Sequence, residues 1–202
     1  MHDETKGTDG SSQGGGAAAS RAAQKARLVT VPLCPDHDVS GFLCQKSKNV
    51  AEFLQKRAAD WQQRKLCRVF VVSNPQNPKQ IWGYYSLSAS VIILKQMDAK
   101  YTEGLPSIKI PMAHIGFMGR HDDDSLKGIG AALVYDAAVR VARSSEEVGA
   151  WGIWLHAENE ELVKWYEKVG FERVLPDPKQ KTGEAPPRAM YGQTEAILKA
   201  LA

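Results

Sequence analysis

A predicted strand, a glycine-containing turn and a predicted helix follow one another directly, and this segment constrains the fold more than any other. The strand covers residues 110–121 and the helix residues 131–143, whose apolar side chains recur at helical spacing. The turn reads Ser125-Leu126-Lys127-Gly128-Ile129-Gly130. Glycine lets backbone N–H groups approach a ligand, and a helix N-terminus adds unpaired donors and a positive dipole end. The segment predicts a diphosphate site, although glycines that serve only packing explain it equally well.

A second motif follows after one helix and one strand. Residues 151–156 predict a strand and residues 158–169 a helix that ends at Gly170. Glycine is typical of the position just after a helix, where the backbone turns left-handed. The turn lacks the Gly-Lys-Ser/Thr ending of a P-loop and the full GxGxxG spacing of a Rossmann turn. Both nucleotide-binding folds are therefore disfavoured.

The remaining segments predict a mixed α/β fold with a mostly antiparallel first half. Residues 27–32, 66–73, 81–94, 171–175 and 189–194 predict strands, because they are short, β-branched or aromatic runs bounded by turn residues. Residues 50–61 predict an amphipathic helix capped by Ser47 or Asn49. Residues 96–109 predict a polar loop, and a short helix closes the chain.

Composition limits the class of protein. The chain has 202 residues, enough for one domain with a core, and no apolar run reaches the roughly 18 residues of a membrane span. Residues 1–27 lack the layout of a secretory signal and are rich in Gly, Ser and Ala. We interpret them as a disordered tail, followed by one domain over residues 28–202 of a cytoplasmic protein. The three cysteines include no CxxC pair, so we expect no disulfide framework and no metal site.

Basic residues gather in one stretch although the net charge is only +3. Seven cations lie between Gln45 and Arg68, against two acidic residues. Such a cluster attracts phosphates, and a solvated helix face has the same composition without any ligand. Both interpretations stay open.

The order of turn, helix, strand and Asn159-x6-Tyr166 helix ending in Gly170-Phe171 resembles the GNAT superfamily of N-acetyltransferases. The likeness covers roughly residues 28–194. It implies a GNAT fold, in which helices flank a mixed, mostly antiparallel sheet whose splayed central strands admit acetyl-CoA as the acetyl donor.

A narrower likeness joins two distant regions. Residues 32–44 with the helix up to Trp61, the segments 69–72 and 83–87, and the run Trp165 to Phe171 resemble GNAT-type toxins of bacterial toxin–antitoxin pairs. This resemblance implies acetylation of the α-amine of aminoacyl-tRNA, a ribbon-helix-helix antitoxin as partner, and a homodimer.

The resemblance also implies roles for single residues. Tyr166 matches the tyrosine that protonates the leaving thiolate, and its alternative is packing in the helix core. Asn159 matches a contact to the pantetheine arm, and capping the helix is its alternative. The donor site further comprises the turn from Ser125 to Gly130, where Lys127 reaches a phosphate or points to solvent, and the strand residues Met118, Gly119 and Arg120.

The toxin pattern carries Arg at the positions of Val39 and Phe117 and Gln or Arg at that of Ser125, so this chain departs from it at all three, and it has an acidic run at residues 122–124. Fewer cations and added anions weaken the attraction to tRNA phosphates. Two alternatives follow: a GNAT enzyme that acetylates a small-molecule or protein amine, and a non-catalytic CoA-binding module. No general base is assigned, because the candidate histidines, His114, His121 and His156, fit structural roles as well.

Overall fold

The computed structural model describes residues 29–105, 109–176 and 188–202. The predicted tail, residues 1–27, lies outside these ranges. Along the described chain the elements are β1 (Val31–Pro32), α2 (Lys48–Lys56), α3 (Ala58–Gln63), β2 (Arg68–Asn74), β3 (Asn77–Ile93), η1 (Leu94–Gln96), α4 (Ala99–Thr102), β4 (Lys109–Arg120), η2 (Asp124–Leu126), α5 (Ile129–Ser144), β5 (Gly152–His156), α6 (Glu160–Lys168), β6 (Glu172–Arg173), β7 (Ala189–Gln193) and α7 (Thr194–Leu201).

The strands of the described residues form one mixed sheet in the order β1-β2-β3-β4-β5-β7-β6. Neighbouring strands are antiparallel except β4 and β5, which run parallel. Parallel neighbours need a crossover connection, and α5 supplies it. The predicted fold class, a mostly antiparallel mixed sheet flanked by helices, is confirmed.

The two central strands, β4 and β5, pair over only part of their length. Their register runs from Met112 with Gly152 to Ile115 with Leu155. Strand β4 continues along β3 as far as Arg120, whereas β5 ends at His156. Beyond Ile115, the edge of β4 that faces β5 has no strand partner within the described ranges. The predicted splay of the central strands is therefore present.

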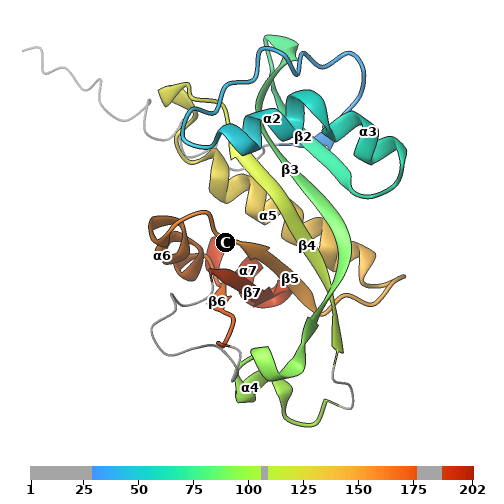
Figure 1. Cartoon of the computed structure of the whole chain (residues 1–202), viewed down its shortest axis with the longest axis vertical. Helices are drawn as coiled ribbons and strands as arrows, with labels where there is room; N and C mark the ends of the chain where they lie inside the picture. Colours follow the sequence, from blue (N-terminus) through green and yellow to red (C-terminus); the bar gives the residue numbers. More distant parts are fainter. Residues whose placement is uncertain (1–28, 106–108, 177–187) are drawn as a thin grey trace, which may run out of the picture.

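Helices cover the two faces of the sheet unequally. Ile115, Leu155 and their alternate neighbours pack in one large cluster with α5, α6 and α7, and we call this side the α5 face. The opposite side, the α2 face, holds two smaller clusters: one under α2 and α3 around Tyr84, the other beside α4 around Tyr191. Figure 1 shows α2 and α3 near the top of the sheet and α4 near the bottom. The middle of the α2 face lies between these covered ends.

Four predictions about elements were wrong in detail. The expected helix over 50–61 is two helices, because the backbone bends at Arg57 (φ −124°, ψ −28°). The expected loop over 96–109 contains α4, whose one turn is too short to show a helical period and is capped by Asp98. The first strand comprises only Val31 and Pro32, and β3 starts at Asn77, before the expected start at residue 81.

A polar cluster ties the start of the described chain to the sheet and to α5. The Asp136 carboxylate accepts hydrogen bonds from the hydroxyls of Tyr85 and Thr30 and from Nε of Arg140, the last at 2.9 Å. The Arg140 guanidinium also lies over the Phe70 ring, 4.0 Å from its centroid. Burial and the bond to Asp136 raise the pKa of Tyr85 well above its ordinary value. Every member of the cluster therefore has a partner, as partly buried polar groups require.

Candidate donor site at the splayed strands

The free edge of β4 begins at a bulge. The register between β3 and β4 shifts by one residue between Tyr85 and Leu87, so Gly116 and Phe117 both oppose Ser86. The Phe117 N–H donates to Ser86 Oγ at 2.9 Å, which holds the extra residue in place. A β-bulge changes the direction in which the following backbone groups point. Here it lies directly at the point where β5 leaves β4.

The backbone N–H groups of Met118 and Arg120 point away from β3. The His121 N–H donates to the Trp82 carbonyl at 2.7 Å. Bonding alternates along an antiparallel pair, so Gly119 bonds to Tyr84, and the residues on either side of it face the other edge. Two of the residues predicted for the donor site therefore present backbone groups to the gap between β4 and β5.

Helix α5 begins next to this edge. Gly128 precedes it with φ +96°, a left-handed conformation that favours glycine. A Cβ added at Gly83 on β3 would lie 3.2 Å from both the Gly119 carbonyl oxygen and Ile129 Cγ2, so these three residues are close neighbours. The buried Ile129 anchors the first turn in the core. The first N–H groups of the helix have no intrahelical acceptor.

Fewer residues of the turn before α5 can bind a diphosphate than the sequence indicated. The Ser125 N–H donates to the Asp123 carboxylate at 2.9 Å, and the Leu126 N–H donates to the Asp123 carbonyl at 3.1 Å. Hydrogen bonds from the side chain and then the backbone of Ser125 lower the pKa of Asp123. The Leu126 side chain is buried and Lys127 is exposed. Backbone donors for a diphosphate are therefore expected from Gly128 to Gly130 rather than from the whole turn.

The acidic run beside the turn has structural partners. Asp122 accepts the N–H of Gln45 at 2.8 Å, and the Arg120 guanidinium donates to the carbonyls of His121 and Asp123 at 2.9 and 3.0 Å. His121 Nδ1 accepts the Asp123 N–H at 3.2 Å, so this histidine also has a structural role. Two of the three carboxylates thus hold the turn together, which the sequence did not reveal.

Tyr166 lies on α6 in the core of the α5 face. Its ring meets Trp165 and Phe171 edge to face, with centroids 4.8 and 5.5 Å apart. Trp165 in turn lies against the first turn of α5, since a Cβ added at Gly130 would be 3.7 Å from its ring. Helix α6 therefore adjoins the predicted diphosphate turn. Tyr166 thus packs in the core, and its role as the acid, which requires only its hydroxyl, stays a prediction.

That hydroxyl is well suited to stay protonated. Burial raises the pKa of Tyr166 well above its ordinary value. The Tyr166 hydroxyl has no hydrogen-bond partner among the described residues. The fully buried side-chain polar atoms without a partner in these residues belong to Ser73, Trp154 and Thr194. Because the Tyr166 hydroxyl is not one of them, it keeps some contact with solvent.

Asn159 caps α6. Its side-chain oxygen accepts the Leu162 N–H at 2.9 Å, and its backbone is extended, as an N-cap requires. The capping alternative is therefore present, and the side-chain NH₂ remains for any further contact. The expected cap of α2 is different: Ser47 precedes the helix but donates its hydroxyl to Glu158 at 2.9 Å instead.

A cation lies beside Phe117, where the toxin pattern has arginine. The Phe117 ring stacks on Phe53 with centroids 3.9 Å apart, and the Arg57 guanidinium covers both rings, 5.5 Å from the centroid of Phe117. The wider basic cluster is exposed on and around α2 and α3, comprising Lys46, Lys48, Lys56, Arg57, Arg64, Lys65 and Arg68. Lys56 and Arg64 pair with acidic neighbours one turn away.

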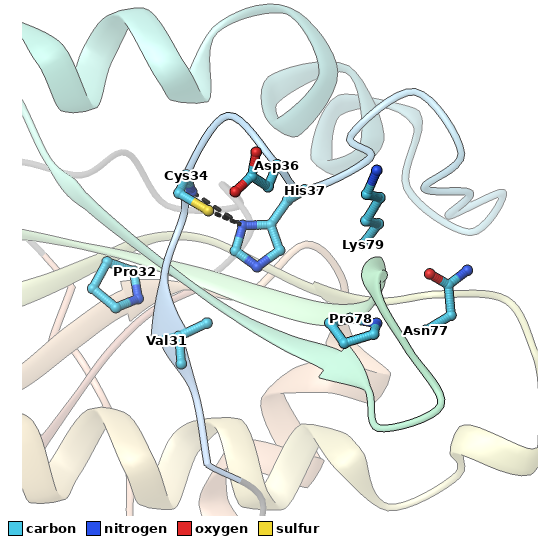
Figure 2. Close-up of a pocket in the computed structure, with 8 residues that line it drawn as sticks. All are labelled: Val31, Pro32, Cys34, Asp36, His37, Asn77, Pro78 and Lys79. Carbon is cyan, nitrogen blue, oxygen red and sulfur yellow. Dashed lines mark hydrogen bonds between the residues drawn. The ribbon is translucent and has the colours of Figure 1, made fainter.

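A separate hollow of about 540 Å³ lies at the β1 edge of the sheet (Figure 2). His37 Nδ1 lies 3.2 Å from Cys34 Sγ and accepts the Cys34 N–H at 3.0 Å. Asp38 accepts the N–H groups of Ser40 and Gly41 at 3.0 and 3.1 Å. The toxin-like residues His37 and Asp38 thus act as turn residues, and none of the predicted donor-site residues lines this hollow.

Within the described ranges, no helix is both long and apolar enough to cross a bilayer. The same residues contain no group of three potential metal ligands.

No protein-family model matches this chain. Solved structures of toxins, in contrast, align with most of it. A mutant of KacT aligns with a TM-score of 0.74 at 18% identity, over 85% of this chain and 97% of that one. AtaT complexed with acetyl-methionyl-tRNAfMet aligns with a TM-score of 0.73 at 22% identity, over 86% and 99%. A mutant AtaT toxin bound to the C-terminus of the antitoxin AtaR and acetyl-CoA gives 0.65 at 23%, over 84% and 94%. The chain therefore has the fold of the GNAT-type toxins that its motifs resemble.

Proposed function

We propose that this chain transfers the acetyl group of acetyl-CoA to a primary amine, the α-amine of aminoacyl-tRNA, as the toxin of a toxin–antitoxin pair. The observation that supports the proposal most is one arrangement. The unpaired edge of β4 lies beside the glycine-led start of α5, and the buried phenol of Tyr166 lies on the adjoining helix.

The residues at this place fit acetyl-CoA as substrate. Backbone N–H groups of Gly128, Ile129 and Gly130 at the positive end of α5 suit its diphosphate. The N–H groups of Met118 and Arg120 suit the amides of the pantetheine arm and the thioester carbonyl, because an extended chain can pair with an open strand edge.

The transfer forms one N–C bond and breaks one C–S bond. The neutral amine attacks the thioester carbonyl, the amine loses a proton, and the leaving sulfur gains one. Tyr166 donates that proton, since its raised pKa keeps the phenol protonated at neutral pH. An α-amine with a pKa of about 8 loses its own proton to water, so no dedicated base is needed.

The acceptor and partners follow from the neighbours and from charge. Solved structures contain AtaT complexed with acetyl-methionyl-tRNAfMet, and the AtaT–AtaR complex bound to DNA. The exposed cations of α2 and α3 suit tRNA phosphates. We include in the proposal a ribbon-helix-helix antitoxin, a homodimer, a cytoplasmic location, and a single domain over residues 28–202.

Incubation of the protein with labelled acetyl-CoA and aminoacyl-tRNA tests the proposal. We expect labelled acetyl-aminoacyl-tRNA, and about a 100-fold lower kcat for Tyr166→Phe. This substitution leaves the packing intact, because the lost hydroxyl has no hydrogen-bond partner among the described residues. Tyr135→Phe, at an exposed tyrosine of α5, is the matched control and keeps full activity.

Label on free amines but not on aminoacyl-tRNA would replace the toxin with another GNAT enzyme. Binding of acetyl-CoA without transfer to any amine would leave the non-catalytic module.

A further inference from the structure

The α2 face carries three neighbouring rings beside the point where β4 and β5 part. His114 on β4 is registered with Trp154 on β5, and their rings stack with centroids 4.2 Å apart at 20°. His156, two residues further along β5, meets Trp154 edge to face at 5.1 Å. We call these three residues the ring strip. The donor site described above uses none of them.

The ring strip is accessible. His114 and Trp154 are half-buried, and His156 is exposed. It lies in the middle of the α2 face: Trp154 is no part of the cluster under α2 and α3, and it joins the cluster beside α4 only as a partly buried residue at the margin. On the α5 face, the gap is backed by the large core cluster. An acceptor that meets the acetyl group at β4 therefore approaches from the α2 face.

The strip reaches the bulge of β4. Gly116 is exposed, and a Cβ added to it would lie 3.7 Å from His114 Cε1 and 3.3 Å from Ser86 Oγ. Glycine therefore leaves open backbone directly beside the imidazole. Gly116 on β4 and His156 on β5 each lie two residues beyond the His114–Trp154 pair, where the two strands separate. The strip thus lines the α2 face at the point where β4 and β5 separate.

One polar group of the strip has no hydrogen-bond partner among the described residues. The indole N–H of Trp154 is enclosed and has no hydrogen-bond acceptor in the described part of the chain. Buried donors are nearly always satisfied by protein, water or a bound group. The ring is held by its contacts with His114 and His156 and by packing against the cluster beside α4, and its N–H takes part in none of them.

The strip is uncharged at neutral pH and ends at a cation. Burial first, and then the neighbouring His156, lowers the pKa of His114 to about 4. Burial and Arg188 lower the pKa of His156 as well. The exposed Arg188 lies near His156 and donates to the Glu158 carbonyl. A ligand that carries a flat ring and a phosphate suits this arrangement, because its ring can stack on the neutral rings and its phosphate can pair with the Arg188 guanidinium.

We propose that the ring strip is the acceptor subsite and that it stacks the 3′-terminal nucleobase of aminoacyl-tRNA. The inference rests on the proposed function. The amino acid is esterified to the ribose of that terminal nucleotide, so a base on the strip brings the α-amine to the bulge at Gly116. Aromatic faces stack any base, which suits an acceptor end that all tRNAs share.

Binding of uncharged tRNA, with and without its 3′-terminal nucleotide, tests the subsite without any need for catalysis. Removal of the nucleotide weakens binding by wild-type protein about 10-fold, the range expected for one base–aromatic stack. Trp154→Leu and His156→Ala remove that difference, so that both tRNAs bind with similar dissociation constants. Trp154→Phe keeps a ring and retains most of the difference. Tyr135→Ala, at an exposed tyrosine of α5, is the control and behaves as wild type.

Urea midpoints report whether each variant folds, and the exposed His156→Ala avoids dependence on the core. Equal binding of both tRNAs by wild-type protein that acetylates aminoacyl-tRNA would overturn the subsite and leave the proposed function intact. An unchanged difference in folded Trp154→Leu and His156→Ala would do the same. Failure of wild-type protein to bind or acetylate any tRNA would overturn the proposed acceptor and this inference with it.

Discussion

Replacing Gly119 with alanine forces β4 against α2. The added Cβ would lie 2.4 Å from Val50 Cγ1, more than 1 Å inside the roughly 3.5–4.0 Å of an ordinary carbon contact. The obstructing atom is a methyl of a β-branched side chain in a helix, which has essentially one rotamer. The helix or the strand must therefore shift. We expect Gly119→Ala to reduce the free energy of unfolding by about 1–3 kcal/mol, as overpacking does.

Truncation of the obstructing side chain reverses the sign of this effect. With Val50→Ala in place, the nearest remaining atom of that side chain is Cβ, at 3.7 Å from the new methyl, an ordinary contact. The φ of Gly119 is not positive, so alanine fits its backbone. Because alanine loses less freedom on folding than glycine, Gly119→Ala then stabilises by up to about 0.5–1 kcal/mol. The coupling between the two substitutions is therefore about 1.5–4 kcal/mol, well above the additivity error.

Urea unfolding followed by tryptophan fluorescence measures the four members of this cycle. Each kcal/mol corresponds to a shift of about 2–4 °C in Tm for a domain of this size, which gives an independent readout. If Gly119→Ala cost the same stability with Val50 intact as with Val50→Ala in place, the packing argument would be refuted. The cycle also measures how firmly α2 holds the part of β4 that we assign to the donor.

Three further outcomes are expected. Asp136→Ala lowers the free energy of unfolding by about 2–4 kcal/mol in urea titrations, because the buried Tyr85 hydroxyl and Nε of Arg140 lose their acceptor. Asp60→Ala, at an exposed ion pair, costs less than about 0.5 kcal/mol. The pKa of His114 is about 4 in the folded chain, against 6.5 in the unfolded chain. Between these two values only the unfolded chain binds the proton, so the contribution of His114 to the free energy of unfolding is fully present above about pH 6.5 and is lost as the pH falls towards 4. His114→Phe should therefore flatten the loss of stability between pH 7 and pH 5 by about 1–2 kcal/mol, and an unchanged pH profile would contradict the assignment. Iodoacetamide at pH 8 should modify the exposed Cys34 first by mass spectrometry, because burial raises the pKa of the other two thiols; simultaneous labelling of all three would argue against the fold around them.

Local sequence signals located most elements, including the strand, turn and helices that carry the predicted donor-site residues. The turn from Ser125 to Gly130 and the helix that ends at Gly170 were recognisable from their glycines, and Gly128 and Gly170 both have the positive φ that glycine adopts readily. The core of α5 followed from helical spacing, and Asn159 from its place before α6. Such features depend on residues within one or two turns of each other. Boundaries were less certain where a one-turn helix or a bend at a single residue leaves no periodic pattern.

The tertiary structure decided which backbone groups are free and which side chains share a face. A pattern of alternating residues cannot reveal the bulge at Gly116, since the extra residue is defined only by the strand opposite. It cannot show that Asp123 already occupies two N–H groups of the predicted turn, or that Arg57 packs on Phe117 from 60 residues away in the chain. The ring strip joins β4 and β5 across a helix of intervening sequence. Sequence thus determined the local conformations of this protein, whereas strand register and helix packing, which depend on contacts between distant residues, determined what those conformations present to a substrate.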